Sequence, residues 1–81
     1  MTYRFTNGTE RWKIDPLEFD QLSRWQLYRA VNEVWSLLKD FSTPEAAMAA
    51  VAGGNTGVAA WDAGAHEAAD FAKDKWSLER W

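Results

Sequence analysis

The sequence predicts an α+β fold that is mainly helical, with an N-terminal β-hairpin over residues 2–14 followed by three to four helices. Three observations lead to this prediction: an Asn-Gly pair between two alternating segments, repeated helix-start signals and an alanine-rich second half. The chain has 81 residues, of which 47% are hydrophobic and 26% charged, so we expect a single globular domain spanning 1–81. The helices are expected over 16–21, 23–41, 44–52 and 58–80, packed as a single layer on the hairpin.

The hairpin prediction depends on Asn7-Gly8, because a two-residue type I′ turn needs positive φ at both central positions. This turn would pair Thr6 with Thr9 and Tyr3 with Trp12. Alternation along the strands then predicts an aromatic face and a basic face, which consist of Tyr3, Phe5 and Trp12 and of Arg4, Arg11 and Lys13 respectively. Two strands alone are marginal in water, so the aromatic face must be covered by helices or by a partner.

Two helices are expected between the hairpin and residue 41. The run from Asp15 to Glu18 has an N-cap Asp, a Pro at the first helical position and a Glu at the third, which predicts a short helix over 16–21. From Leu27 to Phe41 the apolar residues follow helical spacing, with Trp35 in the middle of the stripe. Residues 17–25 do not share that phase, which favours a break near Ser23, although one kinked helix would also fit.

The second half of the chain repeats the same start and stop signals. Ser42-Thr43-Pro44-Glu45 starts a helix and Gly53-Gly54 ends it, which gives the helix over 44–52. Apolar residues from Val58 to Trp76 then follow one side of a long helix over 58–80. The many alanines between residues 46 and 72 predict close helix–helix packing.

Neither of two candidate chemical sites is complete. His66, the only histidine, is spaced with Asp62 and Asp70 on one expected helix face, but a metal site normally needs about four ligands and the chain has no cysteine. The run Gly53–Gly57 precedes a helix start, where an anion is often bound, but it lacks the preceding strand and the Lys-Ser or Lys-Thr of phosphate loops. We therefore predict no catalytic, cofactor or metal site, and a protein that is not an enzyme.

The aromatic content favours a protein-binding function. Six of the 81 residues are Trp, which is enriched at interface centres. Leu22 and Trp25 lie out of phase with the helical stripe, and the hairpin's basic face lies opposite its aromatic one. The predicted partner-binding residues are therefore Trp25, Leu22, Arg4, Arg11 and Lys13. A free hairpin edge would also allow homodimerisation.

We expect a small protein that occupies or bridges a partner's surface, as an inhibitor or assembly factor does. Short, acidic, cysteine-free proteins of this kind are typical of phages and mobile elements. The alternative is an obligate accessory or structural subunit of a larger complex or virion. Direct nucleic-acid binding is disfavoured by a net charge of −3 and a pI of about 5.0. No apolar run reaches 18 residues and no leader pattern opens the chain, so we expect a cytoplasmic protein without a membrane span.

Overall fold

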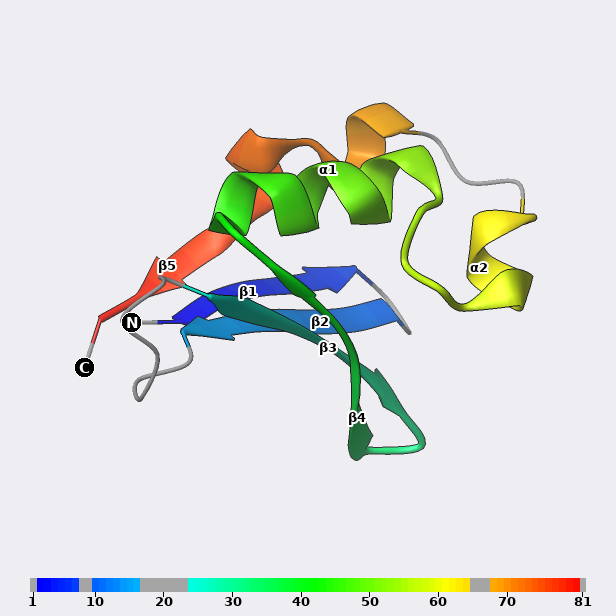
Figure 1. Cartoon of the computed structure of the whole chain (residues 1–81), viewed down its shortest axis with the longest axis horizontal. Helices are drawn as coiled ribbons and strands as arrows, with labels where there is room; N and C mark the ends of the chain where they lie inside the picture. The colour runs from blue at the N-terminus through cyan, green and yellow to red at the C-terminus, as the bar shows by residue number, and fades with distance from the viewer. Residues whose placement is uncertain (1, 8–9, 17–23, 65–67, 81) are drawn as a thin grey trace.

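A five-stranded antiparallel sheet, not a helical layer, is the main element of the protein (Figure 1). The computed structural model describes residues 2–7, 10–16, 24–64 and 68–80. Its elements are β1 (Thr2–Asn7), β2 (Glu10–Pro16), β3 (Trp25–Val31), β4 (Val34–Phe41), α1 (Pro44–Gly53), α2 (Ala59–Asp62), the 3-10 helices η1 (Ala68–Phe71) and η2 (Lys73–Lys75), and β5 (Ser77–Glu79). The strands lie in the order β4-β3-β2-β1-β5. The prediction of a mainly helical fold is therefore wrong.

The N-terminal hairpin is present, with a register two residues from the expected one. Asn7 pairs with Glu10 and Phe5 with Trp12, and residues 8 and 9 lie outside the described part of the chain. Because a shift of two residues keeps every side chain on its own face, the expected separation of an aromatic and a basic face is preserved. Strand β2 is paired with β3, and β1 is paired with β5 from Thr2 to Arg4. Most of the edge that a homodimer through this hairpin would use is therefore occupied within the chain.

A second hairpin replaces the helix expected over 23–41. Strands β3 and β4 pair from Trp25–Phe41 to Val31–Val34, and the turn between them has positive φ at Asn32 (52°) and Glu33 (65°). These angles are those of a two-residue type I′ turn, which usually carries glycine at the second position. The helical stripe failed because nine of the fifteen residues from Leu27 to Phe41 are apolar, so several fall on one side of a helix whether or not the segment is helical. The sheet also gives β2 a neighbour that an isolated hairpin lacks.

Asp15 and Pro16, which were expected to start a helix, instead end strand β2. Asp15 pairs with Gln26 and Pro16 with Trp25, so both residues are part of the sheet. Proline is tolerated at a strand terminus, where few ladder hydrogen bonds are lost. The rest of the helix expected over 16–21, and the break near Ser23, fall on residues 17–23, outside the described residues.

Helix α1 confirms the prediction for 44–52. The Thr43 side chain accepts a hydrogen bond from the Ala46 N–H at 3.1 Å, and Pro44 occupies the first turn. Gly54 ends the helix with φ of 72°, a left-handed conformation that favours glycine.

The long helix expected over 58–80 is divided into α2, η1, η2 and β5, so this prediction is wrong. The Trp76 indole N–H donates to the Phe71 carbonyl at 3.3 Å, and the Lys75 N–H donates to the Ala72 carbonyl at 2.9 Å. In a continuous α-helix the Lys75 N–H would bond the Phe71 carbonyl instead. The irregular backbone thus provides the acceptor that a buried indole requires.

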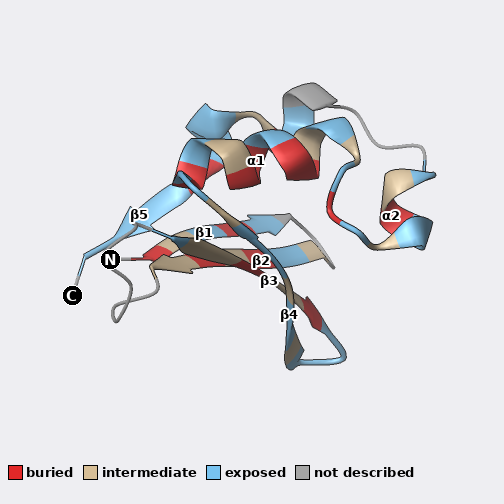
Figure 2. Cartoon of the chain, viewed as in Figure 1, coloured by how far each residue is buried: buried red, intermediate tan, exposed pale blue. Residues whose placement is uncertain are grey.

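The core lies between the sheet and the helical segments, and Figure 2 shows the buried residues of α1 on the side facing the strands. It consists of Phe5, Trp12, Ile14, Leu27, Ala47, Met48, Val51, Trp61, Phe71 and Trp76. Ring centroids are 5.0 Å apart for Trp12 and Trp61 and 4.9 Å apart for Trp61 and Phe71. Three of the six tryptophans are therefore used in the core of so small a domain.

Candidate functional site

The sheet face away from α1, called the open face below, is made of three rows of cross-strand neighbours. The row nearest the β3–β4 turn consists of Thr6, Arg11, Ala30 and Trp35. The middle row consists of Ser77, Arg4, Lys13, Tyr28 and Leu37. The last row consists of Glu79, Thr2, Asp15, Gln26 and Asp40. The pairing register therefore gathers the cations in the first two rows and three carboxylates in the third.

Two cations lie against aromatic rings in the first two rows. The Lys13 ammonium is 4.9 Å from the centre of the Tyr28 ring and 4.8 Å from that of Trp35. The Arg11 guanidinium is 5.5 Å from the Trp35 ring centre. These distances are within the range of cation–π attraction. Together with the adjacent Leu37, which is 51% exposed, these residues form what we call the basic–aromatic cluster: Arg11, Lys13, Tyr28, Trp35 and Leu37.

The last row, called the acidic row below, forms ion pairs with the cations of the middle row. Arg4 Nε lies 2.6 Å from Glu79 Oε2, and Lys13 Nζ lies 3.7 Å from Asp15 Oδ2. Arg11 has no carboxylate within salt-bridge distance among the described residues. Of the three cations on the open face, Arg11 is therefore the one without a described carboxylate partner.

The predicted partner-binding residues are divided by the sheet. Arg4, Arg11 and Lys13 lie on the open face, as the alternation predicted. Trp25 lies on the other face, half-buried against the core, with its ring 5.9 Å from Tyr3 in an edge-to-face contact. Leu22 lies outside the described residues.

The helical wheel missed the aromatic part of the open face. It assigned Tyr28 and Trp35 to a buried stripe, whereas the structure leaves both half-exposed on a sheet surface. The signal that was available is the spacing of Trp35 and Leu37, which are two residues apart and so share one face of a strand.

Among the described residues, the β3–β4 hairpin also carries three of the four most exposed large aliphatic side chains. Val31 is 55%, Val34 64% and Leu37 51% exposed. Strand β4 is at the end of the strand order, with β3 as its one neighbour in the described sheet. An outer strand presents unpaired backbone groups to which another strand can add.

No protein-family model, curated protein or solved structure matches this chain. The geometry of its surfaces and cavities is therefore the basis for a functional assignment. Among the helices that the structure describes, none has the length and apolar character needed to cross a membrane.

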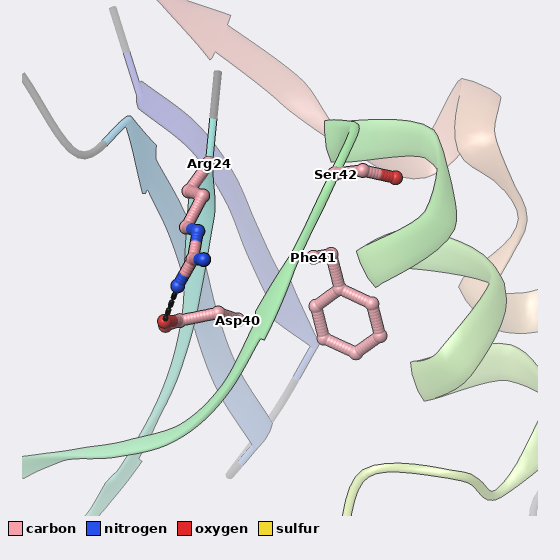
Figure 3. A pocket seen from close by; sticks show the side chains of 4 residues that line it. All are labelled: Arg24, Asp40, Phe41 and Ser42. Carbon is pink, nitrogen blue, oxygen red and sulfur yellow. Dashed lines mark ion pairs between the residues drawn. The ribbon is translucent and has the colours of Figure 1, made fainter. Parts of the chain in front are cut away.

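A hollow beside β4 is lined by Arg24, Asp40, Phe41 and Ser42 (Figure 3). Arg24 and Asp40 form an ion pair at 4.0 Å on one side of the strand, while the Phe41 ring lies on the other side. The Ser42 hydroxyl points away from the ion pair. Nucleophilic catalysis needs a base within hydrogen-bond reach of the nucleophile, and this arrangement does not provide one.

The glycine-rich run before α2 is held by an internal carboxylate. Asp62 accepts hydrogen bonds from the Thr56 N–H at 2.9 Å, the Thr56 hydroxyl at 2.8 Å and the Gly57 N–H at 2.9 Å. The backbone N–H groups that would bind a phosphate are thus already occupied. Because its carboxylate makes these contacts, Asp62 is not available for the candidate ligand set with His66 and Asp70. His66 itself lies outside the described residues. No cluster of three metal-ligating side chains occurs among the residues that are described.

Proposed function

We propose that this protein is a non-enzymatic protein-binding module whose open face occupies a partner's surface, as an inhibitor or assembly factor does. The observation that carries the proposal is the basic–aromatic cluster on a sheet face that α1 does not cover. We further propose a cytoplasmic location, which a sequence without cysteine supports because disulfides mark oxidising compartments.

The residue types of the cluster support binding to a protein. Trp, Tyr and Arg are the side chains most enriched at the energetic centres of protein interfaces. Here Lys13 holds Trp35 and Tyr28 in place in the unbound protein. Little conformational entropy of these two side chains would therefore be lost on binding. The exposed Leu37 beside Tyr28 adds apolar area next to the rings.

The charge distribution favours a protein over a nucleic acid. Two of the three cations on the open face already pair with carboxylates of the same chain, Arg4 with Glu79 and Lys13 with Asp15. Affinity for a polyanion grows with the number of phosphates that are neutralised, and the acidic row would repel them. A protein surface of mixed charge can match both the cationic and the acidic rows.

A charge reversal at Arg11 tests the proposal, with Lys73→Glu as the matched control. Both cations are exposed, but Lys73 lies in η2 and outside the open face. Proteins retained from a lysate of the source organism by the immobilised chain would be identified and purified, and their dissociation constants measured. We expect Arg11→Glu to weaken binding at least about tenfold, because a like charge at an interface is costly, and Lys73→Glu to leave it within about twofold.

Two results would contradict the proposal. Equal binding by the wild type and by both variants would place the interface off the open face. Retention that disappears after nuclease treatment, with steep salt dependence on single-stranded DNA or RNA, would identify a nucleic-acid binder instead.

A further inference from the structure

The outer edge of β4 has a sequence that is complementary to itself in the antiparallel direction. The strand runs Val34, Trp35, Ser36, Leu37, Leu38, Lys39, Asp40 and Phe41. Its side chains alternate, so Trp35 and Leu37 lie on the open face while Val34 and Ser36 lie on the helix side. Leu38 packs against the core and so also lies on the helix side.

We propose that β4 pairs with β4 of a second copy of this chain, with Ser36 opposite Ser36 at the two-fold axis. This register places Trp35 opposite Leu37 of the second copy on the open face. On the helix side it places Val34 opposite Leu38 of the second copy. From Val34 to Leu38, every directly opposed pair is then apolar except the two small serines at the axis, and cross-strand pairs are the unit that stabilises a sheet.

The charges at the ends of the paired segment match in the same register. Glu33, in the β3–β4 turn, becomes level with Lys39 of the second copy, and the symmetry repeats this contact at the other end. Both side chains are exposed, and neither forms a salt bridge with another described residue of its own chain. Val34 and Leu37, two of the most exposed aliphatic side chains, are covered by the same pairing. Charge and apolar complementarity thus select a second copy as the occupant of this edge.

The register shift in the β3–β4 ladder sets the length of the pairing. Leu27 pairs with Lys39 and Tyr28 with Leu37, so Leu38 is the extra residue of a bulge. A bulge bends a strand and disturbs regular pairing next to it. The pairs of Ser36 with Ser36 and of Trp35 with Leu37 lie within the regular part of β4, Val34 to Leu37. Leu38 and Lys39 meet Val34 and Glu33 of the second copy at the bulge, where the pairing is less regular.

The resulting dimer has one continuous sheet in the order β5-β1-β2-β3-β4, followed by β4-β3-β2-β1-β5 of the second copy. The two open faces lie side by side, so the dimer carries two basic–aromatic clusters. The pairing uses the edge of β4 and does not depend on what the open face binds. It extends the proposed function, because two linked sites bind a partner with repeated epitopes more tightly than one.

A disulfide at the two-fold axis tests the register directly, because the chain has no cysteine of its own. Residues directly opposite in an antiparallel pair have Cα atoms about 4.5 to 5.5 Å apart, within disulfide range. Ser36→Cys should therefore form a covalent dimer under mild oxidation. The control is Ser42→Cys, which is also exposed and follows β4. Its copies would be roughly 40 Å apart in this register, at about 3.3 Å per residue, and should remain monomeric on a non-reducing gel.

A charge-swap series tests the dimer without cysteine. Glu33→Lys and Lys39→Glu should each raise the dimer dissociation constant about tenfold, measured by analytical ultracentrifugation, because each creates two like-charge contacts. The double variant should return to within about threefold of the wild type, since the swapped pair attracts again. A wild type that is monomeric at all concentrations, or Ser36→Cys that cross-links no better than Ser42→Cys, would overturn the proposal. Normal partner binding by such a monomer would show that the proposed function stands without it.

Discussion

Replacing Asp62 should show most clearly whether its carboxylate holds the loop between α1 and α2 in place. Its carboxylate joins the end of α2 to the turn at Thr56 and Gly57 through three hydrogen bonds of 2.8 to 2.9 Å. Thr56 is completely buried, so its N–H has no access to water as a substitute partner. Replacing Asp62 by Ala leaves this buried donor without an acceptor.

The cost of Asp62→Ala can be estimated from these contacts. A hydrogen bond to a charged acceptor contributes about 1.5 to 3 kcal/mol, and the three contacts share one carboxylate and are not additive. The exposed Gly57 N–H can turn to water, so the two contacts at Thr56 dominate the estimate. We expect a loss of about 3 to 5 kcal/mol from a total stability of roughly 4 to 12 kcal/mol for a chain of this size.

Urea unfolding followed by tryptophan fluorescence is the assay, supported by a thermal melt in which each kcal/mol corresponds to about 4 to 8 °C. Asp62→Asn should lose less, about 1 to 2 kcal/mol, because its single oxygen still serves Thr56 while its amide opposes the Gly57 N–H. Asp74→Ala is the control, since this exposed aspartate should change stability by under about 0.5 kcal/mol. If Asp62→Ala is within about 1 kcal/mol of the wild type, the carboxylate does not hold this loop.

Two further predictions concern positions where the backbone or the core decides the outcome. Gly54→Ala should lower the free energy of unfolding by about 1 to 3 kcal/mol in urea titrations, because φ is 72° and the added Cβ would lie 3.0 Å from the Asp62 carbonyl oxygen. Gly53→Ala is its matched control and should raise stability by up to about 1 kcal/mol, since nothing lies within 4 Å of the added Cβ; equal effects at both glycines would refute this account. Trp25→Ala should lower the melting temperature through a loss of about 1.5 to 3 kcal/mol, because half of a large ring packs on Tyr3 and the core; a change under about 0.5 kcal/mol would return Trp25 to the list of interface residues.

Short-range signals predicted the parts of the fold that local chemistry determines. Helix α1 follows from its cap, its proline and its terminal glycine, which act within a few residues. The two faces of the N-terminal hairpin follow from alternation, which survives an error of two residues in the register. The prediction of a turn centred on Asn7-Gly8 is wrong, because Asn7 pairs with Glu10 within the sheet.

The rest of the fold depends on contacts that no local pattern contains. The segment from Trp25 to Phe41 fits a helical stripe, and its turn at Asn32-Glu33 has no glycine to mark a hairpin. Its strand conformation is selected by pairing with β2, whose partner residues are nine to nineteen positions away in the sequence. The alanine-rich end has high helix propensity, but Phe71 and Trp76 can fill the core only if the backbone between them is not a regular helix.

At the candidate site, too, only the residues of a local hairpin were placed correctly from the sequence. Arg4, Arg11 and Lys13 were placed on one face because they lie on two strands of a local hairpin. Tyr28 and Trp35 join them through strands whose existence the sequence did not reveal.

The position of each tryptophan is more informative than the number of them. Trp12, Trp61 and Trp76 are buried, so their removal should unfold the protein before it affects a surface. Trp35 differs because what covers its ring is the charged end of Lys13 and the guanidinium of Arg11, not aliphatic core. A ring that is held by cations is oriented in the unbound protein and still has area to bury against a partner. This combination of order and remaining exposure is what a binding surface needs, and among the described tryptophans it singles out Trp35.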